Sequence, residues 1–191
     1  MFQIKLLIPL TFFLMIFATV TTTAQNGKSF DIGVEVQAYP TGVIPGLHFE
    51  FGLSEKDGLL GRIGYNIVDH RDLGVQDDEK GGGFGFSAGY RRYFKANRQG
   101  FFLGARTDLW FNKIDWKDNP DSPNEVEVEG RTEITVLQPT AEAGYVVNLG
   151  NGSWSFVPNI AFGAEINIKT EGRPVGESAI LLVGFTFRKR F

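Results

Sequence analysis

The sequence predicts an all-β fold: an eight-stranded antiparallel up-and-down transmembrane β-barrel, preceded by a cleavable signal peptide. Eight segments alternate apolar and polar residues with the two-residue period of a strand. The connections between these segments alternate largely between short and long. The last segment alternates apolar and polar residues up to the terminal Phe191. An unpaired apolar strand at the edge of a sheet would aggregate in water, so this strand is expected to pair with the first one and close a barrel whose apolar face meets lipid.

Residues 1–24 have the organisation of a secretory signal peptide. Lys5 supplies a positive charge, an apolar stretch runs from Leu6 to Val20, and small residues up to Ala24 offer a cleavage site. A membrane-spanning helix is the alternative. The stretch contains Pro9 and is shorter than the roughly 20 residues that a spanning helix needs, so we expect cleavage.

Residues 25–191 are expected to form one outer-membrane β-barrel domain. The chain contains no Cys, which excludes a lipid-anchored signal and a disulfide framework. Its net charge of −3 gives no basic footprint for nucleic acid, so no nucleic-acid partner is expected. The 24 Gly and 18 Phe residues suit a barrel of closely packed strands with an aromatic surface.

The strands are expected in the order in which the alternation appears along the chain. Their ranges are 29–39, 43–53, 59–69, 84–94, 101–112, 132–149, 154–168 and 178–191. Tight turns are expected at 54–58, 95–100 and 150–153, and long polar loops at 69–83 and 113–131. Outer-membrane barrels have short periplasmic turns and longer external loops, so both termini should be periplasmic.

Alternation alone leaves open which face of the strands points inward. A soluble, lipocalin-like barrel would place its apolar face inside. The polar face here carries many Gly residues and no mid-strand Lys, which suits a narrow and crowded lumen better than a face in water. The lumen should therefore hold a charge network of Glu35, Glu50, Arg62, Arg91, Arg106, Asp108, Glu142 and Glu165. Side chains fill the interior of an eight-stranded barrel, so we expect a plug rather than a conduction path.

The second and third expected strands predict one specific pairing in the lumen. Counting back from the turn at 54–58 places Glu50 opposite Arg62 and His48 opposite Gly64. Directly opposed residues have Cβ atoms about 4.5–5.5 Å apart, close enough for a Glu and an Arg to meet.

The signal, the eight strands, the unequal connections and the terminal Phe191 resemble the small outer-membrane barrels of the OmpA/OmpX type. The Gly-rich strands, with Tyr90-Arg91-Arg92-Tyr93-Phe94 closing the fourth, resemble the PorT-like outer-membrane barrels of Bacteroidota. The resemblance implies a place in the bacterial outer membrane, in contact with its lipid. It also implies assembly by the barrel-assembly machinery, which would read Phe187 and Phe191. Lys189 departs from the apolar residue usual at its position.

The expected role is structural, adhesive or ligand-binding, through the loops 69–83 and 113–131, without catalysis. The alternative is a lipid-modifying barrel enzyme with His48 or His70 as base, but strand two has no Ser beside His48 to act as a nucleophile. No cofactor or metal is expected, because the acidic stretches do not match calcium-loop spacing. Residues 81–85 are interpreted as a flexible loop rather than a phosphate site, since a strand and not a helix follows.

Overall fold

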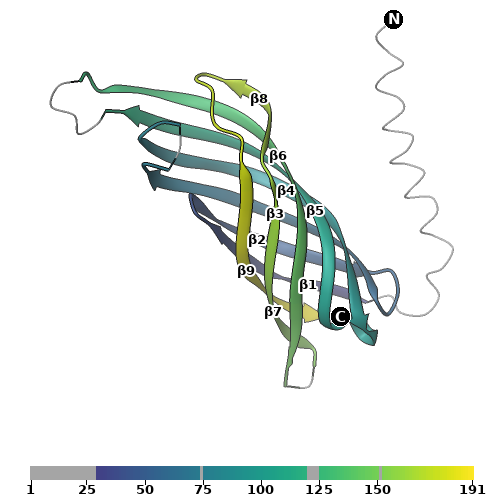
Figure 1. The fold of residues 1–191 in the computed structure, drawn as a ribbon. Helices are drawn as coiled ribbons and strands as arrows, with labels where there is room; N and C mark the ends of the chain where they lie inside the picture. The colour runs from purple at the N-terminus through teal and green to yellow at the C-terminus, as the bar shows by residue number, and fades with distance from the viewer. Residues whose placement is uncertain (1–28, 74, 120–124, 151) are drawn as a thin grey trace, which may run out of the picture.

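The computed structural model describes residues 29–73, 75–119, 125–150 and 152–191. The expected signal peptide, residues 1–24, lies outside the described residues. The described chain is built of antiparallel strands that close on themselves (Figure 1). The strands are β1 (Phe30–Tyr39), β2 (Gly42–Gly52), β3 (Asp57–Arg71), β4 (Asp78–Lys95), β5 (Gln99–Asp118), β6 (Val128–Leu149), β7 (Trp154–Ala164), β8 (Ile166–Glu171) and β9 (Ala179–Arg190).

Closure of the barrel joins its first and last strands. β1 pairs with β2 on one side and with β9 on the other. Beyond the end of β9, the Phe191 amide donates to the Phe30 carbonyl at 2.8 Å. The pairing of the two ends satisfies backbone groups that an open edge would leave exposed, and it confirms the predicted antiparallel barrel.

The strand predicted over 154–168 is broken in two. β7 pairs with β6 and β9, whereas β8 pairs with β6 alone, after a register shift between Thr135 and Val136. At the break, the Glu165 amide donates to the Ser178 carbonyl, and the Asn167 amide donates to the Glu177 carboxylate. Because β7 and β8 occupy successive parts of one position in the barrel wall, the barrel has eight strands around its circumference.

The two long loops predicted at 69–83 and 113–131 are mostly strand. β3 and β4 remain paired as far as Arg71 and Asp78, and β5 and β6 as far as Asp118 and Val128. In Figure 1 the β5–β6 hairpin extends farthest from the barrel. The interpretation of Gly81–Gly83 as a flexible loop is also wrong, because these residues belong to β4. A Cβ on Gly83 would lie 1.7 Å from the Phe111 carbonyl oxygen, so the glycine allows close approach of two strands.

The predicted pairing of Glu50 with Arg62 is wrong by two residues. His48 lies opposite Arg62, and Glu50 lies opposite Leu60. The turn is tighter than expected, because the Leu53 amide donates to the Asp57 carbonyl at 2.8 Å and β3 begins at Asp57. A shift of two residues preserves the face on which each side chain lies, so Glu50, His48 and Arg62 all still point inward.

An apolar belt surrounds the outer wall of the barrel, whereas the inner wall holds charged side chains toward the short turns and an apolar cluster toward the long hairpins. Large apolar side chains stand exposed on the outward face all around the barrel, among them Leu47, Phe86 and Ile160, each more than half exposed. The inward face holds fully buried carboxylates and guanidinium groups. A soluble barrel has the reverse arrangement, and its surface does not carry an apolar belt of this extent. The soluble alternative is therefore wrong, and the chain is a transmembrane β-barrel.

Aromatic rings lie at the short-turn end of the belt. Phe30 lies 4.7 Å from Phe51, Phe94 lies 5.4 Å from Phe101, and Trp154 stacks on Phe187 at 5.0 Å, as measured between ring centroids. Such girdles mark the boundary between hydrocarbon and headgroups. Within the part of the chain that is described, no helix has the length and apolarity needed to cross a membrane.

Candidate functional site

The barrel interior holds the largest group of interacting charged residues. Seven of the eight predicted lumen residues are buried: Glu35, Glu50, Arg62, Arg91, Arg106, Asp108 and Glu142. They come from β1 to β6, and the even spacing within each strand directs them inward. Hydrogen bonds and ion pairs group them into two clusters, one around Glu50 and one around Glu35.

Glu50 is the centre of the cluster nearer the short turns. Arg188, Arg98 and Arg91 donate to its carboxylate at 2.5, 3.3 and 3.4 Å, and the Tyr93 hydroxyl lies 2.8 Å from each of its oxygens. The side chain of Glu50 is completely buried, so these partners replace all of its hydration.

Glycine makes room for this cluster. A Cβ on Gly58 would lie 2.4 Å from a carboxylate oxygen of Glu50. The Gly residues that weaken a strand by propensity thus permit long charged side chains inside a narrow barrel.

Glu35 is the centre of the second cluster. Arg106 and Arg62 donate to one of its oxygens at 2.7 and 2.8 Å, and the Thr186 hydroxyl donates to the other at 3.0 Å. Arg62 also donates to Asp108 at 2.6 Å. Arg62 therefore has carboxylates on two sides, neither of them Glu50.

His48 lies between the two clusters. Its Nδ1 is 3.1 Å from Glu35, and its Nε2 is 3.7 Å from Glu50. The imidazole is fully buried and faces two carboxylates rather than a hydroxyl nucleophile. Its ring therefore bridges the space between the carboxylates at the centres of the two clusters.

Glu142 has an arginine partner in the lumen, whereas Glu165 does not. Arg91 binds Glu142 through two hydrogen bonds, at 2.6 and 3.1 Å, the fork geometry that makes such pairs strong. Glu165 is only partly buried and accepts a hydrogen bond from Gln138 at 3.2 Å. It lies at the break between β7 and β8 and contacts none of the arginines in the clusters.

The network contains residues that the sequence prediction omitted: Asp31, Gln37, Tyr93, Arg98 and Arg188. Asp31 lies between Phe30 and Ile32, and Arg188 follows Phe187 at the inward parity of β9, so the rule used for the other strands would have found them. Arg98 belongs to the short helix η2 (Ala96–Arg98) in a turn, and its side chain reaches back into the lumen. No sequence pattern indicates this placement.

An apolar cluster fills the lumen toward the long hairpins. It contains Ile44, Val68, Trp110, Ile114, Ile134, Val136, Ala161, Ile180 and Leu182. Beyond it, the Arg173 guanidinium lies 4.3 Å from the Trp116 ring centroid. Charged side chains and apolar side chains thus fill successive levels of the same interior.

The extended parts of β3, β4, β5 and β6 carry a regular arrangement of charges on their outward face. One row of directly paired residues reads Asp69, Lys80, Asp115 and Arg131, and the next row reads Arg71, Asp78, Lys117 and Glu129. The sign alternates along each row and along each strand. We call these eight residues the charge ladder.

Ion pairs within the charge ladder are exposed. Lys80 contacts Asp69 at 2.9 Å, and Arg131 contacts Asp115 at 2.6 Å. The hydrogen bond from the Arg131 guanidinium lowers the pKa of the Asp115 carboxyl below its ordinary value. The alternating signs favour the observed register, since a shift by one pair on the same face would oppose like charges.

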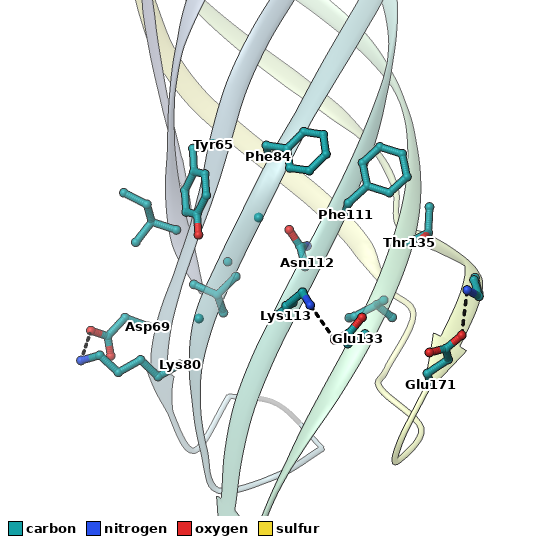
Figure 2. Close-up of a pocket in the computed structure, with 17 residues that line it drawn as sticks. Tyr65, Asp69, Lys80, Phe84, Phe111, Asn112, Lys113, Glu133, Thr135 and Glu171 are labelled. Carbon is teal, nitrogen blue, oxygen red and sulfur yellow. Dashed lines mark hydrogen bonds and ion pairs between the residues drawn. The ribbon is translucent and has the colours of Figure 1, made fainter.

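A groove of about 610 Å³ lies on the outer wall beside the charge ladder. Figure 2 shows the rings of Tyr65, Phe84 and Phe111 in one row, with charged residues nearer the hairpin ends. The ion pair between Lys113 and Glu133, at 2.7 Å, crosses this side of the groove.

His70 lies near the end of β3, in the extended hairpin that β3 forms with β4. It pairs with Glu79 of β4, and its Nε2 lies 3.3 Å from that carboxylate. Among residues 29–73, 75–119, 125–150 and 152–191, no group of three or more His, Asp or Glu side chains is placed to hold a metal ion.

An apolar outer belt, a closed sheet and a lumen filled by side chains together define a transmembrane β-barrel of the outer-membrane type. No family model matches the chain, and no curated protein matches it.

Solved barrels with a similar overall arrangement include the N-terminal β-barrel domain of Pseudomonas aeruginosa OprF. It is 12% identical, with a TM-score of 0.48, covering 87% of this chain and 100% of that one. Ail, the attachment invasion locus protein of Yersinia pestis, solved with the heparin analogue sucrose octasulfate, is 11% identical, with a TM-score of 0.48, covering 86% and 97%. Neisserial surface protein A is 9% identical, with a TM-score of 0.48, covering 85% and 95%.

Proposed function

We propose that this protein is an integral barrel of the bacterial outer membrane that acts through its external hairpins, in a structural, adhesive or ligand-binding role. The observation that carries the proposal is the unequal length of the two ends. β3 to β6 continue beyond the aromatic rings of the belt as charged hairpins, whereas the connections at the other end are short. Rigid strands that present exposed charged rows are suited to contact with an extracellular ligand or protein.

The orientation follows the rule for barrels of this kind, with long hairpins outside and both termini in the periplasm. We propose that residues 1–24 direct export and that the barrel-assembly machinery reads Phe187 and Phe191. Both rings are exposed on the outward side of the closing strand, which supports this role. Membership of the PorT-like barrels of Bacteroidota is part of the same proposal and rests on the Gly-rich strands and the Tyr90–Phe94 segment.

Protease accessibility tests the orientation. Protease added to intact cells should cut between β5 and β6, within residues 119–127, and leave the barrel protected. Cutting that requires a breached outer membrane would show that the orientation is wrong. Heat-modifiable migration of the membrane fraction on gels should accompany the protection, since a folded barrel runs differently from its boiled form.

We further propose that the barrel has no catalytic activity. His48 is sealed between Glu35 and Glu50, and His70 faces Glu79, so neither imidazole is directed at a hydroxyl nucleophile. Envelope lipids from cells with and without the protein should have the same composition. A modified lipid that depends on the protein would overturn this proposal and favour the lipid-modifying alternative.

A further inference from the structure

Arg92 is a charged residue on the lipid-facing wall of the barrel. It lies on the outward face of β4, and its side chain is 56% exposed. Phe94 follows two residues later on the same face, so Arg92 lies on the membrane side of the ring pair formed by Phe94 and Phe101. A charge on this wall is costly at the middle of a bilayer and costs little where it reaches the headgroups. The guanidinium of Arg92 is therefore expected at the level where lipid phosphates begin.

Asp57 fixes the orientation of this guanidinium. Asp57 is the first residue of β3 and lies directly opposite Arg92. Arg92 donates through Nη1 to both oxygens of its carboxylate, each at 2.6 Å. The hydroxyls of Tyr90 and Ser54 donate to the same carboxylate. Because the bonds to Asp57 use one nitrogen, Nε and Nη2 of Arg92 keep N–H groups that can donate to a ligand.

Apolar side chains surround Arg92 on the outer wall. Leu103 lies directly opposite on β5 and is about half exposed. Tyr90 and Leu59, which are paired with each other, continue the outward surface toward the middle of the membrane. A fixed guanidinium beside exposed apolar side chains matches the order of a phospholipid, in which a phosphodiester joins the acyl chains. Guanidinium groups bind phosphate oxygens through two parallel hydrogen bonds, a geometry that an ammonium does not offer.

Lys189 is a second cation on the outer wall at the short-turn end, and it is matched to Arg92 in position. Lys189 lies opposite Trp154, the first residue of β7, as Arg92 lies opposite the first residue of β3. Its ammonium lies 4.8 Å from the Phe191 ring centroid and 5.8 Å from that of Trp154. The charge of Lys189 is thus directed at aromatic rings, whereas that of Arg92 is held by a carboxylate.

We propose that Arg92 binds the phosphodiester of one phospholipid from the leaflet beside the short turns. Nε and Nη2 donate to the phosphate oxygens, Asp57 holds the guanidinium in place, and an acyl chain covers Leu103. The inference rests on the proposed orientation, which places the short turns on the periplasmic side, where the leaflet of an outer membrane consists of phospholipid. It adds a lipid site to a protein whose proposed ligand contacts are otherwise extracellular.

Native mass spectrometry of the full-length mature barrel in detergent tests the site. The protein is titrated with phosphatidylethanolamine, with phosphatidylglycerol and with diacylglycerol of the same acyl chains. The two phospholipids share the phosphodiester, so both should give one tight adduct, and diacylglycerol should bind more weakly. Diacylglycerol binding as tight as that of the phospholipids would overturn the proposal. A preference above about tenfold for either headgroup would also overturn it, because a group other than the phosphodiester would then be recognised.

Variants of the two matched cations locate the contact. Arg92→Gln should weaken both phospholipid adducts about tenfold, through the loss of charge-assisted hydrogen bonds to the phosphate. Lys189→Gln is the control, because it removes the same charge at the same end of the barrel and should leave the adducts almost unchanged. Equal weakening by both variants would indicate a general attraction of lipid to positive charge and would overturn the proposal, as would weakening by neither.

Arg92→Lys separates the geometry of the site from its charge. A lysine keeps the charge beside Asp57 but has no fork, so the adducts should still be weaker than those of the unchanged protein. Full binding by this variant would overturn the assignment of a fork contact. Heat-modifiable migration verifies that each variant is folded, and Arg92→Lys serves as the test if Arg92→Gln does not fold. A folded, membrane-inserted barrel without preference for the phosphodiester would refute this site alone, whereas absence of the protein from the outer membrane would refute the proposed function.

Discussion

Replacing Glu50 by Gln should be among the most destabilising single changes in the barrel. Gln has nearly the same shape, so no cavity forms and the effect reports the lost charge. Glu50 is fully buried, and its partners Arg188, Arg98 and Arg91 would retain their charges with one fewer carboxylate to balance them. Removing one partner from a buried ion pair costs about 3–5 kcal/mol, and we expect a loss in this range.

The reciprocal change should cost less. After Arg188→Gln, Glu50 still has two arginine partners. Asp31 still contacts Arg98 at 3.1 Å and Arg190 at 2.8 Å, so we expect the free energy of unfolding to fall by about 1–3 kcal/mol. The double variant restores the charge balance, and its cost should fall below the sum of the singles by about 0.5–3 kcal/mol.

Denaturant unfolding in lipid vesicles measures these free energies, with tryptophan fluorescence and gel migration as two independent readouts. Glu133→Gln is the control, because it removes a carboxylate from an exposed pair and should leave the midpoint almost unchanged. A loss below about 1 kcal/mol for Glu50→Gln, or strict additivity in the double variant, would refute the view that the lumen cluster is tightly coupled.

Three further expectations can be tested independently. Purified barrel in planar bilayers should show no large steady pore, because both charged and apolar side chains fill the lumen; a reproducible porin-sized conductance would contradict the plug. Deleting Phe191 should reduce the folded outer-membrane population, whereas unchanged levels would argue against its role in assembly. The hydrogen bond from Arg131 makes the pKa of Asp115 lower in the folded protein than in the unfolded chain. The pair therefore contributes its full stabilisation at pH values above the unfolded pKa, and this contribution is lost as the pH falls through the folded pKa. NMR titration should give a lowered midpoint that Arg131→Gln raises; a midpoint unmoved by that substitution would reject the pairing.

The sequence was sufficient to predict the fold class and the side on which each strand residue lies. Successive side chains in a strand point to opposite faces whatever the neighbouring strand does, so parity is a local property. That is why Arg62 and Glu50 were placed inward correctly although their register was wrong. It is also why the broken strand at Glu165 still keeps Ile166 and Ile168 on the lipid side.

Strand length was harder to predict, because charged residues at the end of a membrane strand can indicate either a loop or a strand that continues beyond the membrane. The charged residues of the charge ladder suggested loops, yet they alternate with Ile114 and Trp116, which pack inside the hairpin. The two-residue period of the strand therefore continues beyond the apolar belt, with charged residues on the outward face and apolar residues on the inward face. Three consecutive glycines obscured the same signal in β4, where a missing Cβ serves close packing.

Alternation along the chain is enough to predict an antiparallel barrel with an apolar outer belt and charged residues inside, because the two-residue period fixes the faces of every strand. Which charged side chains contact one another depends on the closed three-dimensional fold. Arg62 reaches Glu35 and Asp108 across the lumen, and Arg98 enters from a turn to join Glu50. Such contacts depend on the turn geometry, on the register and on the reach of long side chains across a closed barrel, none of which is recorded in the alternation along a single strand.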